Sequence, residues 1–165
     1  MVEDGPLNPT DVRLAAMDLL SRREHGSEEL TNKLRRRFKR HENALNIIMA
    51  ELERLIAEGL LSDERFAASM VRQLIGRGLG PRRLDQELRA KGVRKAWQSC
   101  ADAPELAVDW FERAEHVYLK KFADKPLPVD SAERQKERAK RARFMQYRGF
   151  EADHFLHLLD INHHY

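Results

Sequence analysis

The apolar residues of this chain recur at helical spacing, and no stretch shows the extended alternation expected of a strand. The clearest stretch runs from Pro81 to Gly92, where Leu84 and Leu88 lie one turn apart among mostly charged residues. Proline suits the first position of a helix, and the glycine is a plausible stop. The pattern predicts a short basic helix over about 81–91 that buries a narrow apolar stripe.

The same design repeats at intervals of about 55 residues. A shift of 54 residues toward the N-terminus pairs Gly80 with Gly26 and brings the two leucines of the stripe onto Leu30 and Leu34. A fainter third copy appears 57 residues further on, where Gly149 takes the place of the stop glycine. Repetition of this length indicates tandem structural units.

Helical spacing and turn residues extend this reading to the whole chain. The expected fold is all-α, with three tandem three-helix repeats in an elongated, curved array. The first helix is expected from Thr10 or Asp11, and the last follows Gly149. The helices between them are expected at about 27–39, 43–58, 63–75, 81–91, 93–99, 105–122 and 131–148.

The repeats are expected at 11–60, 61–103 and 104–165, after a disordered N-terminus at 1–10. The first ten residues contain one glycine and two prolines and have little to bury. The sequence Asp-Ala-Pro at 102–104 breaks the helical pattern, which sets the last boundary.

Charge is unevenly distributed, although the 165-residue chain has a net charge of only +3. The windows 22–40, 72–95 and 133–148 together carry a net charge of +16, which leaves −13 for the remainder. Each window contains one copy of the basic helix. Such segregation fits a basic stripe that attracts polyanions or acidic protein grooves, and it equally fits the solvated faces of an ordinary helical protein.

Several function classes lack support in the sequence. The lone cysteine, Cys100, cannot form an internal disulfide, and no apolar run approaches the roughly 20 residues that a membrane helix needs. The N-terminus lacks the pattern of a signal peptide, so a cytoplasmic location is expected. The glycines at 76–80 are not followed by the Gly-Lys-Ser/Thr of a phosphate-binding loop.

No catalytic or metal-binding arrangement is recognisable, so we expect no enzyme activity and no cofactor. His154 and His157 lie close together on an expected helix, with His163 and His164 behind them. These histidines could bind a metal adventitiously, but a structural or surface role fits them better. Cys100 has no organised partner and fits a small buried residue.

Four motifs in order give the chain a family resemblance. They are Ser-Glu-Glu-Leu at 27–30, Gly-Leu-Leu-Ser-Asp-Glu-Arg-Phe-Ala at 59–67, Gly-Leu-Gly-Pro-Arg-Arg-Leu-Asp-Gln-Glu-Leu at 78–88 and Arg-Phe-Met-Gln-Tyr-Arg-Gly-Phe at 143–150. Together they resemble the RecX family of bacterial regulatory proteins, over about residues 11–160. Leu79 stands where the family often has an aromatic residue, and the tail at 160–165 matches no family motif.

The resemblance implies a cytoplasmic modulator of the RecA recombinase in DNA repair and the DNA-damage response. Proteins of this family bind in the groove of the RecA filament on single-stranded DNA and suppress strand exchange, ATP hydrolysis and co-protease activity. It also implies tandem three-helix repeats, which agrees with the periodicity. DNA contact is expected to be weaker or indirect, the chain is expected to be a monomer, and no membrane partner is expected.

The basic helices supply the candidate contacts, with Tyr147 as a candidate for stacking on a base or a partner side chain. The set comprises Arg35, Arg36, Arg37, Arg77, Arg82, Arg83, Arg89, Lys91, Arg141, Arg143, Tyr147 and Arg148. Two functions remain open for it. One is docking on the filament, and the other is direct DNA binding by a helical module that acts independently of a recombinase.

Overall fold

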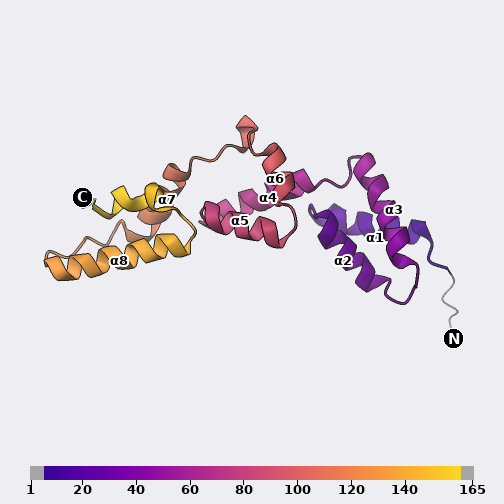
Figure 1. The fold of residues 1–165 in the computed structure, drawn as a ribbon, viewed down its shortest axis with the longest axis horizontal. Helices are drawn as coiled ribbons and strands as arrows, with labels where there is room; N and C mark the ends of the chain where they lie inside the picture. The colour runs from indigo at the N-terminus through magenta and orange to yellow at the C-terminus, as the bar shows by residue number, and fades with distance from the viewer. Residues whose placement is uncertain (1–5, 161–165) are drawn as a thin grey trace. The chain divides into compact units, whose positions relative to one another are not determined.

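The computed structural model describes residues 6–160, and all regular structure within that range is helical (Figure 1). The prediction of an all-α helical repeat is therefore confirmed. In chain order the elements are α1 (Pro9–Arg22), α2 (Ser27–Arg37), α3 (Ala44–Ala57), α4 (Asp63–Gly76), α5 (Pro81–Ala90), α6 (Arg94–Cys100), the 3-10 helix η1 (Pro104–Leu106), α7 (Trp110–Phe122), α8 (Ser131–Tyr147), α9 (Ala152–Phe155) and the 3-10 helix η2 (Leu156–Asp160).

The chain forms two compact units. Unit 1 comprises Met1–Ser69 and Leu88–Ala101, and unit 2 comprises Met70–Glu87 and Asp102–Tyr165. Helices α4 and α5 each contribute one end to each unit. The three repeat boundaries expected from the sequence stay predictions.

The core of unit 1 lies among α1, α2 and α3, which contact one another pairwise. The stripe leucines Leu30 and Leu34 of α2 are fully buried, as are Ile48 and Leu55 of α3. Burying each such side chain stabilises the fold by about 1.5–3 kcal/mol relative to leaving it in water. The narrow apolar stripe predicted for the first basic helix is therefore what anchors it.

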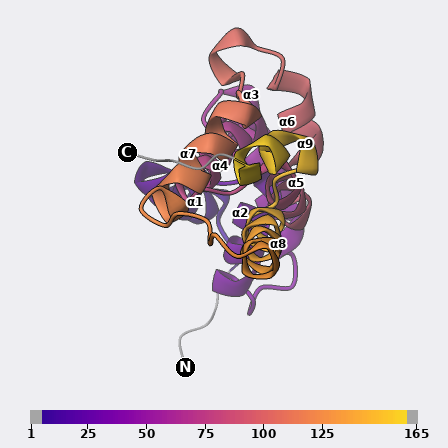
Figure 2. The ribbon, with the colours of Figure 1, turned by 90° about the vertical axis from the view of Figure 1, so that its left-hand side faces the viewer.

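The core of unit 2 gathers the apolar faces of α7, α8 and α9, and α9 packs against both other helices (Figure 2). Its largest fully buried side chains are Tyr118, Met145, Phe150 and Phe155. Met145 is the residue at the end of α8 that corresponds to the buried leucine of the earlier basic helices. The third copy of the repeat thus buries the same position.

The stop glycines of the second and third copies end their helices in the same way. Gly92 and Gly149 have left-handed φ values of 70° and 92°. In each case the N–H of the glycine bonds to the carbonyl three residues back, and that of the next residue, Val93 or Phe150, bonds five residues back. This is the Schellman arrangement, which requires a residue that tolerates positive φ.

Three helix ends differ from the sequence prediction. Residues 9 and 10, expected in the disordered N-terminus, belong to α1, because Asn8 Oδ1 accepts a hydrogen bond from the Thr10 amide at 2.9 Å. Residues 1–5 of that expected segment lie outside the described residues. The last helix is only α9, followed by the 3-10 turn η2.

The helix expected over 105–122 begins only at Trp110. Asp109 caps it, because one carboxylate oxygen accepts hydrogen bonds from the amides of Phe111 and Glu112, each at 3.0 Å. The residues before the cap form η1 and an extended link. The predicted start was wrong because apolar residues at helical spacing continue back to position 106, before the cap at Asp109.

Candidate functional site

The start of α5 is docked on the end of α8 by backbone hydrogen bonds within unit 2. The Gly80 amide donates to the Arg148 carbonyl at 2.7 Å, and the Arg82 amide donates to the Gly149 carbonyl at 3.0 Å. Pro81 between them has no N–H to satisfy. The partial negative charge at the end of α8 therefore meets the partial positive charge at the start of α5.

Two glycines make this docking sterically possible. A Cβ added at Gly80 would lie 2.6 Å from the carbonyl carbon of Gly149 and from the Phe150 nitrogen. A Cβ added at Gly149 would lie 2.6 Å from the Arg83 nitrogen. The sequence indicated that these glycines are turn and stop residues. It did not predict the close approach of the two helices, because that approach joins segments about 70 residues apart in the chain.

The docking gathers exposed and half-buried cations near an exposed aromatic ring. The Arg83 guanidinium lies 5.8 Å from the Tyr147 ring centroid, within cation–π distance, and the tyrosine is 74% exposed. Arg148 donates to the Arg77 carbonyl at 3.0 Å. We call Arg77, Arg82, Arg83, Tyr147 and Arg148 the α5–α8 junction. It brings together five of the candidate residues predicted from the sequence.

Arg141 is removed from the candidate contacts because the structure places it in the core of unit 2. The residue is 2% exposed, and its side chain donates to Tyr118 Oη and Glu137 Oε1, each at 3.0 Å. Its guanidinium also lies over the Phe122 ring at 4.8 Å. The sequence placed Arg141 among the candidate contacts of a basic helix, yet position 141 lies one helical turn before the buried Met145.

Unit 1 has a basic surface of its own. Lys33, Arg36 and Lys91 line a groove of about 260 Å³ between α2 and the end of α5, with Glu28 and Glu29 beside them. The structure thus brings two candidates, Arg36 and Lys91, to one groove. We call the exposed cations Arg35, Arg36, Arg37 and Lys91 the α2 surface; Arg36 and Lys91 line this groove, whereas Arg35 and Arg37 line other hollows beside α2.

The remaining candidates divide between the units. Arg89, in the last turn of α5, belongs to unit 1, and Arg143 of α8 belongs to unit 2. Both side chains are exposed. Neither is placed in the α5–α8 junction or in the lining of the α2 groove.

Part of the charge near the α2 groove serves the fold. The Arg23 guanidinium donates to both carboxylate oxygens of Glu29, and Lys33 pairs with the same group at 3.4 Å. Burial by itself raises the pKa of Glu29, but the Arg23 and Lys33 contacts outweigh it and hold the pKa at about 2. The Lys33 ammonium is therefore already paired with a carboxylate within unit 1.

The same cluster contains a buried histidine. His25 is 2% exposed, and its two ring nitrogens face the Arg23 carbonyl and the Lys33 ammonium, each at 3.0 Å. The ammonium can only donate, so the ring accepts at Nε2 and is neutral, with its proton on Nδ1. Burial, the largest effect, lowers the pKa of His25.

Sequence reasoning missed three cations of α7. Arg113, Lys120 and Lys121 line a pocket in unit 2 that also includes Arg77 and Arg148 of the junction. A signal was available, because positions 113, 116 and 120 carry Arg, His and Lys at the spacing of one helix face. This helix lies between the basic windows 72–95 and 133–148, outside both.

Other chemistry considered from the sequence finds no organised site. Across residues 6–160 no group of three or more His, Cys, Asp or Glu side chains is arranged to hold a metal. His154 Nδ1 accepts a hydrogen bond from the Glu151 amide at 3.2 Å and so caps α9. His163 and His164 lie outside the described residues. The half-buried Cys100 has a pKa raised by burial, which disfavours the reactive thiolate.

None of the helices that the structure describes has both the length and the apolar character to span a membrane.

Comparison with known proteins decides the family. Models of the second and third three-helix domains of RecX match residues 62–100 and 107–157. "Regulatory protein RecX" of Pseudomonas syringae pv. tomato is 43% identical over 88% of this chain and 87% of its own length. The chain belongs to the RecX family. A RecX relative from Pseudomonas putida is 44% identical over similar coverage.

Solved RecX structures have the same fold. One crystal structure of RecX covers 93% of this chain and 73% of its own, with a TM-score of 0.65 at 23% identity. RecX from Lactobacillus salivarius covers 92% of this chain and 96% of its own, also with a TM-score of 0.65 and 22% identity. The helices of this chain therefore form the same helical repeat fold as these RecX structures.

Proposed function

We propose that this protein binds the RecA–DNA filament and modulates, mainly inhibits, its recombinase, ATPase and co-protease activities in DNA repair. Family membership supports a regulatory role, since the relatives are named as regulatory proteins. The observation that carries the proposal further is the α5–α8 junction. There, backbone bonds between two helices hold the half-buried Arg83 beside the exposed Tyr147.

The composition of the junction fits a protein partner. Arginine and tyrosine are enriched among the residues that dominate protein interfaces, and both bury large surfaces. The start of α5 is fixed by two backbone hydrogen bonds, so little backbone ordering remains to be completed on binding. Arg83 is further restrained by Tyr147. The junction is therefore suited to an acidic protein groove.

The α2 surface offers a second, independent attachment. When one surface is bound, the other is held near the partner at an effective concentration on the order of millimolar if the linkage spans the two sites. A polymeric partner presents many equivalent sites, which favours such bivalent binding. A protein attached to one conformation of the filament disfavours every other conformation, and ATP turnover slows if turnover requires the change.

The test is ATP hydrolysis by preformed RecA filaments on single-stranded DNA. We expect hydrolysis to fall as this protein is added at constant salt, and to approach a plateau when the filament is saturated. Hydrolysis that stays unchanged while light scattering confirms intact filaments would remove the proposed inhibition.

Direct DNA binding is a second candidate, favoured by the exposed Tyr147 among arginines, which can stack on a base. A protein that neutralises several phosphates loses affinity with salt at a log–log slope of about −0.7 per contact on single strands. Tight binding to naked DNA with such a slope, unaffected by added recombinase, would replace filament docking as the function. Tighter binding to filaments than to naked DNA at equal salt supports filament docking.

We also propose that the protein acts in the cytoplasm, where its partner filament forms, and that it acts as a monomer. Light scattering at micromolar concentration measures the oligomeric state. A mass near 19.3 kDa is expected, whereas twice that mass would indicate a dimer.

A further inference from the structure

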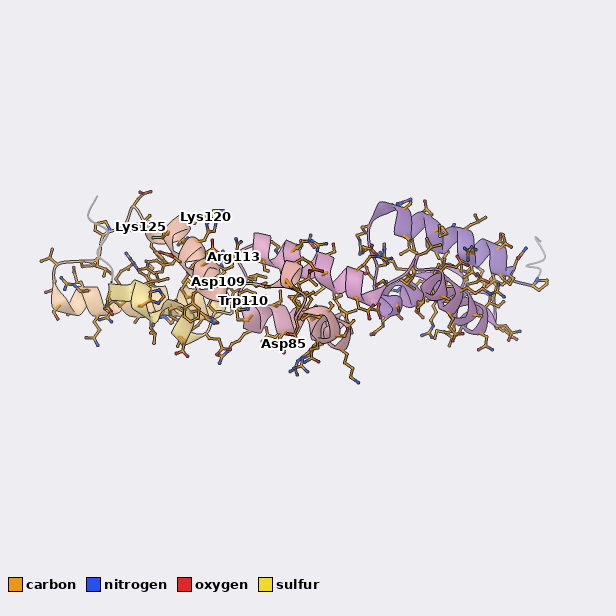
Figure 3. The ribbon with its side chains drawn as sticks, turned by 90° about the horizontal axis from the view of Figure 1, so that it is seen from above. Asp85, Asp109, Trp110, Arg113, Lys120 and Lys125 are labelled. Atoms are coloured by element: carbon orange, nitrogen blue, oxygen red, sulfur yellow. The ribbon has the colours of Figure 1, made fainter. Side chains whose placement is uncertain are left out.

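A pocket of about 230 Å³ in unit 2 combines cations from three segments. Its walls are the turn after α4, one face of α7 and the end of α8. Arg113 and Lys120 extend from the same helix, α7, and Lys125 follows just beyond that helix (Figure 3). The pocket is large enough for several water molecules or a group of comparable size.

The lining is strongly basic. Five cations line it, Arg77, Arg113, Lys120, Lys121 and Arg148, together with one histidine, His116, and no carboxylate. None of the ion pairs found in residues 6–160 neutralises these five side chains. Cations concentrated in a partly enclosed site create a positive potential that attracts anions.

Two of the guanidinium groups are fixed in position. Arg113 donates to the Ile75 carbonyl at 3.3 Å, and Arg148 donates to the Arg77 carbonyl at 3.0 Å. Arg113 Nε is buried and has no hydrogen-bond partner. A buried donor left unsatisfied costs about 1–3 kcal/mol, so the fold holds this guanidinium beside the pocket at an energetic cost.

The partial negative charge at the C-terminus of α4 balances only part of the positive charge of the five pocket cations. The C-terminus of a helix carries a partial charge of roughly −0.5, which one of the two anchored arginines would already balance. Lys120, Lys121 and Arg77 make no hydrogen bond from their side chains to that turn among the described contacts. The surplus of positive charge is therefore available to a ligand.

We propose that this pocket binds a phosphate-bearing anion. A terminal phosphate carries about −1.5 to −2 charges with three acceptor oxygens, whereas a carboxylate carries −1. Planar guanidinium groups such as those of Arg113 and Arg148 match phosphate oxygens in pairs, and lysines add point charges. The phosphate can belong to a nucleoside polyphosphate or to the end of a nucleic-acid strand. Phosphate binding in this pocket is independent of the proposed binding to the RecA filament.

The test is calorimetric titration of the full chain with tripolyphosphate, with citrate as a multivalent anion that carries only carboxylates. The variant Lys120→Gln/Lys121→Gln removes two exposed pocket charges with little risk to the fold. Lys125→Gln/Lys136→Gln is the matched control, because both lysines are exposed in the same unit and outside the pocket lining. Both variants lower the net charge by two.

We expect tripolyphosphate to bind the wild type and the control equally, and the pocket variant at least about tenfold more weakly, as expected for two lost charge-assisted contacts. Citrate that binds as tightly as tripolyphosphate would overturn the proposal, as would equal losses in both variants or no binding of tripolyphosphate. Two further titrations identify the source. ADP binding tighter than tripolyphosphate indicates a nucleotide, and a preference for a 5′-phosphorylated over a 5′-hydroxyl oligonucleotide indicates a strand end.

Discussion

The substitution Gly80→Ala tests the docking of α5 on α8 more sharply than any change of charge. The added Cβ would lie 2.6 Å from the Gly149 carbonyl carbon and from the Phe150 nitrogen. Both are backbone atoms, so no side chain can rotate away to relieve the contact. We expect the two helices to separate by a few tenths of an ångström or more.

The magnitude follows from two effects. Forcing an extra methyl into a packed site costs about 1–3 kcal/mol. Separation also weakens the bonds from the Gly80 and Arg82 amides, at 2.7 and 3.0 Å, each of which contributes about 0.5–1.5 kcal/mol. Because the same movement relieves the clash and lengthens the bonds, the two effects do not add fully. We expect unit 2 to lose about 2–4 kcal/mol of unfolding free energy.

Urea denaturation followed by tryptophan fluorescence measures this loss. Trp110 lies edge-on to Phe150 at 6.5 Å between ring centroids, so its emission reports on the core of unit 2. The other tryptophan, Trp97, belongs to unit 1 and is replaced by phenylalanine in every sample. We expect the urea midpoint to fall with the slope unchanged.

Gly76→Ala is the matched control. Gly76 is the last residue of α4, and a Cβ there meets no atom within 4 Å. We expect the control to be neutral or more stable by up to about 1 kcal/mol, because alanine restricts the unfolded chain. If Gly80→Ala behaved like this control, the close packing of α5 on α8 would be wrong.

Three further predictions concern titratable or charged side chains that the structure buries wholly or in part. Arg141→Ala should lower the urea-derived stability by about 2–4 kcal/mol through loss of buried hydrogen bonds, whereas Arg143→Ala should change it by less than about 0.5 kcal/mol; equal effects would contradict the burial of Arg141. The folded pKa of Glu29 is lowered from 4.5 to about 2, so its stabilisation is complete above pH 4.5 and disappears as pH falls toward 2. After discounting for the half-exposed Arg23, Glu29→Gln should cost about 1–2 kcal/mol at pH 7 and nothing near pH 2, and a cost independent of pH would refute this. The folded pKa of His25 is also lowered, so wild-type stability should decrease as pH falls below about 6.5 and His25→Gln should flatten that dependence in urea titrations; an unchanged slope would show that His25 is not the cause.

Local signals carried the fold prediction. Leu30 and Leu84 identified the buried stripe, and Gly92 and Gly149 identified helix ends, because each effect acts within a few residues of the chain. The start of α7 was missed, since the apolar pattern continued through Leu106 and outweighed the cap at Asp109. Local reasoning therefore located helices better than it located their ends.

The site was predicted less completely because it depends on contacts between distant segments. Arg82 and Arg83 could be named from the basic helix, but their association with Tyr147 requires α5 to dock on α8. Arg141 has the same composition around it as the exposed arginines, and only the fold shows that it is buried. Arg113 was overlooked because α7 lies between the basic windows 72–95 and 133–148, and only the fold brings Arg77 and Arg148 into the same pocket.

The most direct test of the proposed function is charge reversal at the junction, with Arg82→Glu/Arg83→Glu compared with Lys95→Glu/Lys136→Glu. The control lysines are exposed, lie outside both the α5–α8 junction and the α2 surface, and give the same change of net charge. Circular dichroism first establishes that both variants keep the helical content of the wild type. ATP hydrolysis by preformed RecA filaments is then measured against protein concentration at constant salt. We expect the control to match the wild type and the junction variant to need at least about tenfold more protein for the same inhibition, a loss of about 1.4 kcal/mol or more. Equal inhibition by the junction variant and the wild type would contradict filament binding through the α5–α8 junction.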